Sequence, residues 1–206
     1  MKREELAVYF IMGTVNCQRD PLVILEEALQ AGVTIFQLRE KGEGALEGEA
    51  LLEFAKRCQA LCRTYNVPFI VNDNIELALA IDADGVHVGQ DDIELGKIRQ
   101  QLANKIIGVS VHNAAEMQLA VAGEADYVGI GPIFATASKA DAKEPAGVTF
   151  LAEARATYPE FPIVAIGGIT PERTAQVLAA GADGVAVISA ICQSANIAQT
   201  IKDFKQ

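Results

Sequence analysis

Gly181-Ala182-Asp183-Gly184-Val185 is the clearest copy of a short pattern that recurs along this chain of 206 residues. In each copy small residues and glycine close a helical stretch, and an apolar stretch begins almost at once. The related copies are Ala31-Gly32-Val33-Thr34-Ile35, Ala83-Asp84-Gly85-Val86 and Ala125-Asp126-Tyr127-Val128. Tight helix-to-strand connections of this kind favour a barrel in which the loops at one end are minimal.

Short apolar, β-branched stretches alternate with helical patterns between these connections, which implies a parallel sheet covered on both faces. The predicted strands are Ala7–Gly13, Thr34–Leu38, Pro68–Val71, Gly85–Val88, Ile106–Val111, Tyr127–Gly131, Ile163–Ile166 and Gly184–Ile188. Predicted helices include Leu22–Ala31, Leu46–Tyr65, Ile75–Ile81, Ala114–Ala122 and Pro171–Ala180. Eight such units favour an α/β fold of the (β/α)₈ TIM-barrel type over an open doubly wound sheet, as one domain over residues 1–206.

The composition excludes a disordered chain, because half of the residues are hydrophobic. The formal net charge is −10, from 27 acidic and 17 basic residues. A surface of this sign repels nucleic acid and anionic membranes, so neither is an expected partner. No apolar run approaches the roughly 18 residues of a membrane span, and we expect a cytoplasmic protein.

Four cysteines are present, and Cys58 and Cys62 are spaced to share one face of a helix. Such a pair is compatible with a dithiol or with half of a metal site. We favour two small reduced hydrophobic side chains, because no neighbouring group of His or Cys residues completes a metal set.

Polar and charged residues gather directly after the predicted strands, at the end where a (β/α)₈ barrel carries its active site. The polar segments are Gln37-Leu38-Arg39-Glu40-Lys41, Asn72-Asp73, Gly89-Gln90-Asp91-Asp92, Ser110 with His112-Asn113, the loop 132–145, Gly167-Gly168-Ile169-Thr170, and Ser189.

The glycine pair Gly167-Gly168 lies between a predicted strand and a helix that opens with Thr170-Pro171. This arrangement leaves backbone N–H groups that can bind phosphate, and Ser189 ends the adjacent strand. Ordinary turn and capping chemistry explains the glycine pair equally well when it is taken alone. Together with Ser189, the pattern favours a phosphate site.

The basic residues Arg39, Lys41 and Lys139 fall at the same end of the predicted barrel, as do Asp73 and Asp92. Two carboxylates beside three bases suit Mg²⁺ bound together with a diphosphate. Three alternatives stay open: a solvated ion-pair cluster around Lys41, a general acid or base among the carboxylates, and a helix cap at Asp73.

His87 alternates with Val86 and Val88, so its side chain is expected inside the barrel, as a hydrogen-bonded core residue rather than a catalyst. The remaining pattern combines a phosphate cradle with a separate cationic and metal-binding patch. This combination indicates a reaction in which a monophosphorylated substrate displaces diphosphate from a second substrate.

The sequence closely resembles the thiamine-phosphate synthases over a stretch from about Tyr9 to Ile191. The resemblance implies the (β/α)₈ fold, a pyrimidine diphosphate and a thiazole phosphate as substrates, and a dissociative displacement through a pyrimidinylmethyl cation. It rests on the segments Gln37-Leu38-Arg39-Glu40-Lys41-Gly42, Val71-Asn72-Asp73, Gly85-Val86-His87-Val88-Gly89-Gln90-Asp91-Asp92, Gly108-Val109-Ser110-Val111-His112, Gly129-Ile130-Gly131-Pro132-Ile133-Phe134 and Ile166-Gly167-Gly168-Ile169.

The resemblance also implies roles for particular residues, with one Mg²⁺ per subunit held by Asp73 and Asp92. Catalysis is assigned to Arg39, Lys41, Ser110 and Lys139. The pyrimidine diphosphate site comprises Gln37, Leu38, Arg39, Glu40, Lys41, Asn72, Ser110 and Lys139. The thiazole phosphate site comprises Thr136, Ala137, Ser138, Gly168, Ile188 and Ser189.

This chain departs from the family in the loop after the sixth predicted strand, where the family usually has Thr-x-Thr-Lys. Ser138 replaces the second threonine and keeps its hydroxyl, and Ala135 stands where the family commonly has proline. Two rival functions stay open: a thiazole tautomerase-like paralogue, and a non-catalytic thiazole-phosphate sensor. The expected partners are small-molecule substrates, and the sequence is compatible with a homo-oligomer.

Overall fold

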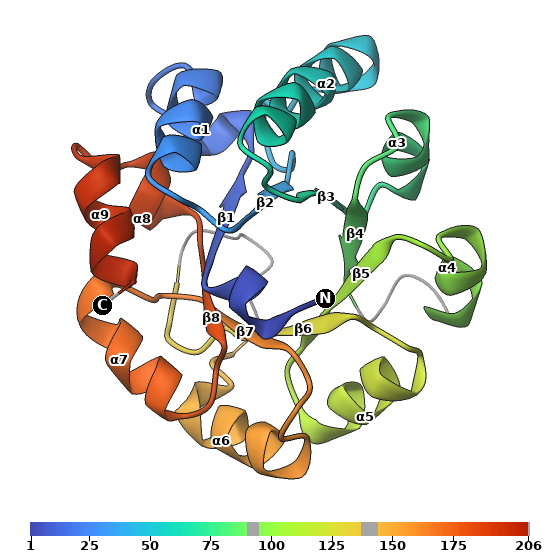
Figure 1. Cartoon of the computed structure of the whole chain (residues 1–206), viewed down its shortest axis with the longest axis vertical. Coiled ribbons are helices and arrows are strands. Elements are labelled where there is room, and N and C mark those ends of the chain that lie inside the picture. Colours follow the sequence, from blue (N-terminus) through green and yellow to red (C-terminus); the bar gives the residue numbers. More distant parts are fainter. Residues whose placement is uncertain (90–94, 137–143, 206) are drawn as a thin grey trace.

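The strands form a closed parallel barrel in the order β1 to β8 in the computed structural model, which describes residues 1–89, 95–136 and 144–205 (Figure 1). β1 pairs with both β2 and β8, and this closes the ring. The predicted (β/α)₈ barrel is confirmed, and each predicted strand lies within one residue of its expected bounds. The strands are β1 (Val8–Met12), β2 (Ile35–Leu38), β3 (Phe69–Asn72), β4 (Gly85–Val88), β5 (Ile106–Val111), β6 (Tyr127–Ile130), β7 (Ile163–Ile166) and β8 (Gly184–Val187).

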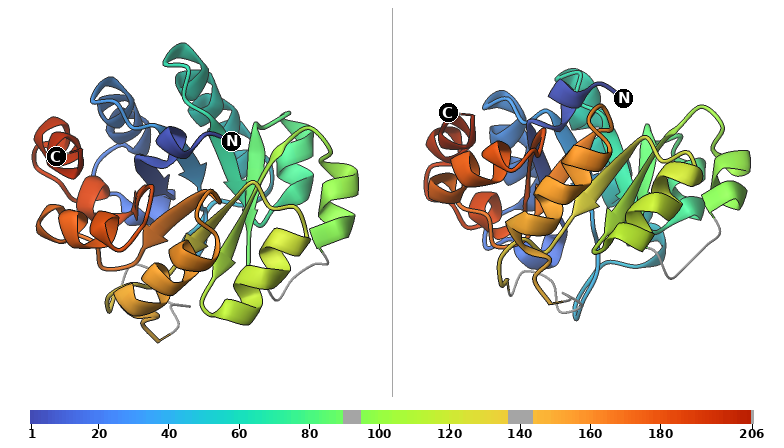
Figure 2. Two further views of the ribbon diagram at one scale, coloured as in Figure 1. Left: turned by 60° about the horizontal axis from the view of Figure 1, so that its bottom comes forward. Right: turned by 90° about the horizontal axis from the view of Figure 1, so that it is seen from below.

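The helices surround the strands on the outside of the barrel, as two further views show (Figure 2). None of those in the described ranges has the length and apolar character needed to span a membrane. The short 3₁₀ helices η1 (Arg3–Leu6) and η2 (Thr14–Asn16) flank β1. The α-helices are α1 (Pro21–Gln30), α2 (Gly48–Thr64), α3 (Ile75–Ala80), α4 (Leu95–Gln101), α5 (Ala114–Ala122), α6 (Gly147–Thr157), α7 (Pro171–Ala179), α8 (Ser189–Cys192) and α9 (Ile197–Phe204).

The recurring sequence pattern has a structural purpose at the amino-terminal end of the barrel. In each copy, the polar residue before an even-numbered strand accepts a hydrogen bond from a backbone N–H near the start of the preceding strand. This bond satisfies a donor at the strand's beginning that would otherwise be unpaired. The four bonds are Val8 N to Thr34 Oγ1 (3.0 Å), and Phe69 N to Asp84, Ile107 N to Asp126 and Ile163 N to Asp183 (2.8 Å each).

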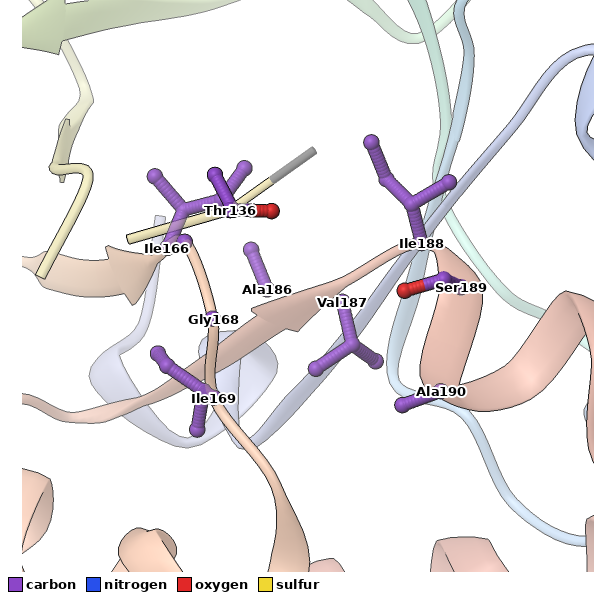
Figure 3. Close-up of a pocket in the computed structure, with 10 residues that line it drawn as sticks. Thr136, Ile166, Gly168, Ile169, Ala186, Val187, Ile188, Ser189 and Ala190 are labelled. Atoms are coloured by element: carbon purple, nitrogen blue, oxygen red, sulfur yellow. The ribbon is translucent and has the colours of Figure 1, made fainter. Parts of the chain in front are cut away.

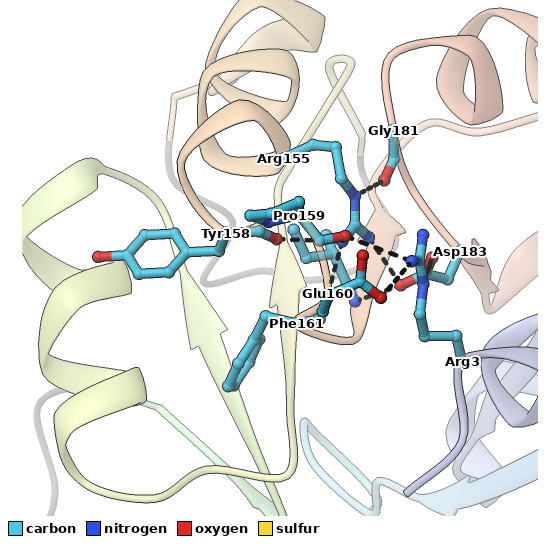
Figure 4. A network of polar contacts seen from close by, with 9 residues as sticks. Arg3, Arg155, Tyr158, Pro159, Glu160, Phe161, Gly181 and Asp183 are labelled. Atoms are coloured by element: carbon cyan, nitrogen blue, oxygen red, sulfur yellow. Dashed lines mark hydrogen bonds and ion pairs between the residues drawn. The ribbon is translucent and has the colours of Figure 1, made fainter.

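Asp183 is the centre of a buried ion-pair network at this end of the barrel (Figure 4). Its carboxylate accepts hydrogen bonds from Arg3 Nε at 2.6 Å and from the Arg155 guanidinium at 2.7 Å. Arg155 also donates from Nε to the carbonyl of Gly181 at 2.7 Å. The Asp183 side chain is only 4% exposed, so the network fixes the α7–β8 connection at the amino-terminal end of the barrel.

The two faces of the strands carry different side chains. Phe10, Phe36 and Phe69 stand side by side on neighbouring strands, with ring centroids 5.6 and 5.8 Å apart. Side chains alternate along a strand, so Tyr9 and Gln37 point to the opposite face, where their polar groups meet at 2.7 Å. The barrel interior is therefore partly polar, whereas the layer between strands and helices is apolar.

Candidate active site

A cluster of polar side chains lies at the carboxyl ends of β2 and β3. The ammonium group of Lys41 forms an ion pair with Oδ2 of Asp73, and Asn72 donates to the same oxygen at 2.8 Å. Asp73 has a left-handed backbone (φ 58°). Asn74, rather than Asp73, accepts the capping bond from the backbone N–H of Leu77 in α3. The carboxylate of Asp73 is thus held toward the loops rather than used as a helix cap.

Glu40 joins the loops that follow β1 and β2. Its carboxylate accepts hydrogen bonds from the backbone N–H of Thr14 at 2.7 Å, from the Thr14 hydroxyl, and from the backbone N–H of Leu46 at 3.0 Å. Beside it, Arg39 is 8% exposed, and its backbone N–H donates to the carbonyl of Met12 at 2.9 Å. The contacts of Glu40 hold the segment that carries Arg39 and Lys41 in place.

A chain of hydrogen bonds crosses the barrel interior and links five strands. Gln37 Nε2 donates to the Tyr9 hydroxyl at 2.7 Å, and the hydroxyls of Tyr9 and Tyr127 are 2.6 Å apart. His87 continues the chain, with Nδ1 3.0 Å from the Tyr127 hydroxyl and Nε2 2.9 Å from Ser110 Oγ. The prediction that His87 enters the barrel as a hydrogen-bonded residue is confirmed. We name Gln37, Tyr9, Tyr127, His87 and Ser110 the interior chain.

The two tyrosines of the interior chain are fully buried, and burial raises the pKa of both phenols. They therefore remain neutral hydroxyls that both donate and accept. Two glycines make room for the rings. A Cβ at Gly108 would lie 2.1 Å from the Tyr127 ring, and one at Gly129 would lie 3.3 Å from the His87 ring.

A cavity of about 50 Å³ lies between the ends of β7 and β8 (Figure 3). Gly168 in its wall has a left-handed backbone, and a Cβ there would lie 2.6 Å from the carbonyl oxygen of Ala135. The cavity adjoins a groove of about 640 Å³ that also includes Asn16, Arg173 and Gln193. The cavity is lined by Thr136, Ile166, Gly167, Gly168, Ile169, Ala186, Val187, Ile188, Ser189 and Ala190.

Arg173 is a basic residue at this groove that was not predicted from the sequence. It donates to the carbonyl of Gly168 at 2.8 Å, and its guanidinium lies 4.5 Å from the centre of the Phe134 ring. A signal was present in the sequence. Thr170 and Pro171 fix the start of α7, so the first turn of that helix, with Arg173 in it, lies beside the glycine pair.

The structure brings the described members of the predicted site together in three groups. Lys41, Asn72 and Asp73 form the first, and Gln37 and Ser110 lie at the ends of the interior chain. Leu38 lies on the opposite face of β2 from Gln37 and is buried there. Thr136, Gly168, Ile188 and Ser189 surround the cavity. Four predicted site residues lie outside the described residues: Asp92, Ala137, Ser138 and Lys139.

No group of three His, Cys, Asp or Glu side chains that could hold a metal ion occurs within residues 1–89, 95–136 and 144–205. Asp73 is nevertheless a carboxylate next to an amide and a lysine, at the mouth of the barrel. A metal at this point would need oxygen ligands from a bound substrate and from water.

Comparison with known proteins gives consistent matches along the chain. The sequence profile described as thiamine monophosphate synthase matches residues 8–191. A thiamine-phosphate synthase of Lysinibacillus sphaericus is 58% identical over 206 residues, which are 100% of this chain and 97% of the relative. One from Anoxybacillus flavithermus is 51% identical over 98% of this chain and 93% of the relative. Among solved structures, thiamine phosphate pyrophosphorylase from Pyrococcus furiosus superimposes with a TM-score of 0.88 at 32% identity, covering 98% of this chain and 95% of that one.

Proposed function

The chain belongs to the thiamine monophosphate synthase family, and on that premise we propose that it forms thiamine phosphate by a magnesium-dependent displacement of diphosphate. Thiamine-phosphate synthesis is the activity of its relatives and makes the chain a transferase. The substrates are a 4-amino-2-methylpyrimidine with a 5-diphosphooxymethyl group and a 4-methylthiazole ethyl phosphate, with or without a carboxylate. The observation that carries this proposal is the cluster of Lys41, Asn72 and Asp73 at the ends of β2 and β3, together with a separate glycine-lined cavity at the ends of β7 and β8.

The diphosphate binds at the ends of β2 and β3 in this proposal. Arg39 and Lys41 supply positive charge, Arg39 through a planar guanidinium that matches phosphate oxygens and Lys41 as a point charge. Lys139 joins them from the loop after β6. Glu40 acts indirectly, because its carboxylate is already bonded to Thr14 and Leu46 and fixes the segment that carries the two bases.

The pyrimidine lies over the mouth of the barrel, between the ends of the interior chain, with Gln37, Asn72 and Ser110 as its polar contacts. The bond between the methylene carbon and the diphosphate oxygen breaks, and its electron pair leaves with the diphosphate. Arg39 and Lys41 stabilise the charge that develops on this leaving group. The thiazole nitrogen then donates its electron pair to the methylene carbon, which forms the new C–N bond. Where the thiazole carries a carboxylate, this group leaves as CO₂ and a proton takes its place on the ring carbon.

The donor set at Asp73 fits a magnesium ion. Mg²⁺ takes one or two protein carboxylates and completes its octahedron with phosphate oxygens and water. Asp73 would hold the ion together with Asp92, one ion per subunit, and Asn72 would orient the Asp73 carboxylate through its 2.8 Å hydrogen bond. When bound, the ion neutralises charge on the departing diphosphate.

The thiazole phosphate occupies the cavity at the ends of β7 and β8. Gly167 and Gly168 approach the ligand closely because they lack side chains, and Ile188 and Ser189 close the opposite wall. Thr136, Ala137 and Ser138 contact the thiazole from the loop after β6. Arg173 adds a positive charge at the groove, since it lies against Gly168.

The two rival functions are separated by one assay on the purified protein with both substrates and Mg²⁺. We expect thiamine phosphate and pyrophosphate to form together. A tautomerase-like paralogue would convert the carboxylated thiazole phosphate without releasing pyrophosphate. A non-catalytic sensor would bind the thiazole phosphate and form no product. Either result would overturn the proposed function.

We place this reaction in the cytoplasm, where thiols stay reduced. Cys17, Cys58, Cys62 and Cys192 are all free thiols, and the last three are buried. Free thiols are typical of proteins in a reducing compartment. The proposed partners are the two small-molecule substrates.

A further inference from the structure

We propose that Arg173 is a positioning residue, which ties the loop after β6 to the glycine pair after β7 and so sets the shape of the cavity for thiazole phosphate. This inference rests on the proposed function, because the cavity is the one assigned to that substrate. It goes beyond the positive charge that Arg173 places at the groove, since it assigns the effect to contacts of the guanidinium with the protein itself.

The guanidinium of Arg173 contacts both loops at once. Its Nη1 donates to the carbonyl of Gly168 at 2.8 Å, and the group lies 4.5 Å from the centre of the Phe134 ring. A charged donor forms a stronger hydrogen bond than a neutral one, and a cation over an aromatic face is attracted by the ring. A planar guanidinium can make both contacts together, which an ammonium group cannot do equally well.

The backbone joins the same two loops as far as Phe134. The N–H of Phe134 donates to the carbonyl of Gly167 at 3.0 Å, so the pairing of β6 with β7 continues beyond both strands. Arg173 extends this connection to the next residue, Gly168. Thr136 follows Phe134 by two residues and lines the cavity. The position of Phe134 therefore determines how Thr136 meets the cavity.

Gly168 lies tightly against the loop after β6. A Cβ on Gly168 would lie 2.9 Å from the Cβ of Phe134 and 2.6 Å from the carbonyl oxygen of Ala135. The Gly168 carbonyl that Arg173 binds shares one planar peptide group with the N–H of Ile169, another residue of the cavity wall. The hydrogen bond fixes this plane before a ligand arrives, which lowers the ordering cost of binding.

The position of Arg173 in its helix supports a role outside that helix. It lies in the first turn of α7, directly after the N-cap Thr170 and the proline at the first helical position. Unpaired N–H groups already give this end of a helix a partial positive charge, so a cation here is unfavourable for the helix. The helix does not explain an arginine at this point, whereas the contacts with Gly168 and Phe134 do.

The first test measures the affinity for thiazole phosphate by calorimetry, with Arg173→Gln and Arg173→Lys. We expect both variants to raise the Kd roughly fivefold, because the lysine keeps the charge but not the planar contacts. The effect should be the same at about 0.05 M and about 0.5 M salt, since salt screens only the attraction between exposed charges. Arg99→Lys is the matched control, because Arg99 donates to the Lys105 carbonyl at 2.9 Å near the start of β5.

The second test is a double-mutant cycle with Phe134→Leu. This variant alone should also raise the Kd roughly fivefold, and its combination with Arg173→Lys should raise the Kd no further, because both changes break one contact. Independent effects would multiply to about 25-fold. In the protein without ligand, hydrogen exchange of the Phe134 amide should be faster in Arg173→Lys than in the unmodified protein.

Full affinity in Arg173→Lys, with a loss only in Arg173→Gln, would show that charge alone explains the effect and would overturn the inference. A loss of about 25-fold in the double variant, or unchanged exchange of the Phe134 amide, would overturn it as well. Absence of thiamine phosphate formation by an unmodified protein that binds thiazole phosphate would instead refute the proposed function.

Discussion

Lys41 and Asp73 form an ion pair across the loops that follow β2 and β3, and Asn72 donates to the same carboxylate oxygen at 2.8 Å. A base and a carboxylate that face each other at a barrel mouth can separate when a ligand brings its own charges. In the proposed reaction Lys41 would pair with the diphosphate, and the Asp73 carboxylate would then be available to hold a metal ion.

Arg39→Ala is expected to lower kcat/KM by roughly 100-fold or more, since removal of one donor to a developing negative charge typically has this effect. Thiazole phosphate binding should be nearly unchanged, because its cavity lies at β7 and β8. Steady-state kinetics and calorimetry measure the two effects. Arg57→Ala, an exposed change on α2, is the control. Loss of thiazole binding alone would show that the two substrate sites have been exchanged.

Asp73→Asn is expected to raise the Mg²⁺ concentration needed for half-maximal activity by about tenfold or more, because a neutral amide binds this ion weakly. Asn tolerates the left-handed backbone of this position, so the loop should keep its shape. A magnesium titration of activity checks the change, with Asp203→Asn on α9 as the control. A titration curve that coincides with that of the unmodified protein would exclude Asp73 as a ligand.

Gly168→Ala is expected to raise the KM for thiazole phosphate by roughly tenfold or more, because the added methyl would lie 2.6 Å from the Ala135 carbonyl in a left-handed backbone. Gly48→Ala is a matched control. Gly48 also has a positive φ, and no atom lies within 4 Å of its would-be Cβ. Equal KM values for the two variants would mean that the strain of positive φ, and not the cavity wall, explains the effect.

Asp183→Asn is expected to lower the free energy of unfolding by roughly 3 kcal/mol, because it leaves Arg3 and Arg155 beside a buried neutral group. Turnover per folded molecule should stay unchanged, since the network lies at the opposite end from the site. Denaturant unfolding checks this. Asp82→Asn is the control, because Asp82 pairs with Lys105 but is 80% exposed. This change should lower the free energy of unfolding by about 0.5 kcal/mol or less. If both variants lost a similar free energy of unfolding, the ion pairs of Asp183 would contribute no more to stability than an exposed pair.

The cysteines are expected to differ in reactivity. Burial raises the pKa of the Cys58 and Cys62 thiols, whereas a hydrogen bond with Cys192 lowers the pKa of Cys17. Iodoacetamide at pH 8 should therefore modify Cys17 in the folded protein and all four cysteines in denaturant, as peptide mass spectrometry would show. Modification of Cys58 or Cys62 at the rate of Cys17 would refute the interpretation of this pair as inert core residues.

The same shifts predict how stability depends on alkaline pH. Cys58 and Cys62 stay protonated in the folded protein, whereas unfolded thiols ionise near pH 8.5. The unfolded chain then binds fewer protons than the folded one, so stability falls as pH rises above about 8.5. Alanine at both positions should reduce this pH dependence in denaturant unfolding measured between pH 7 and 10.

The barrel could be predicted from the sequence because the signals for its strands and connections lie in short segments of the chain. The residues before β4, β6 and β8 form the pattern in which Asp84, Asp126 and Asp183 bond to the preceding strand, so pattern and structural purpose coincide. The helices α4, α6 and α9 were not among those predicted. α9 packs on α1 and buries its Ile197, Ile201 and Phe204, in a tail that carries no family motif.

For the candidate site, the sequence could predict only that its residues lie at the carboxyl ends of the strands. Lys41, Asn72 and Asp73 meet because adjacent parallel strands end side by side. The interior chain was not predicted, since the bond between Tyr9 and Tyr127 joins residues 118 positions apart. Nor does the sequence indicate that the Glu40 carboxylate is bonded to Thr14 and Leu46, because this depends on how two loops pack.

The most direct test of the central claim, metal-dependent displacement of diphosphate, is the stoichiometry of products in one reaction with both substrates. We predict that thiamine phosphate and pyrophosphate appear in a 1:1 ratio with Mg²⁺, that neither appears with EDTA, and that added Mg²⁺ restores both. Thiamine phosphate formed at the same rate in EDTA would contradict the metal dependence. Mg²⁺-dependent loss of the pyrimidine diphosphate without any thiamine phosphate would contradict the displacement itself.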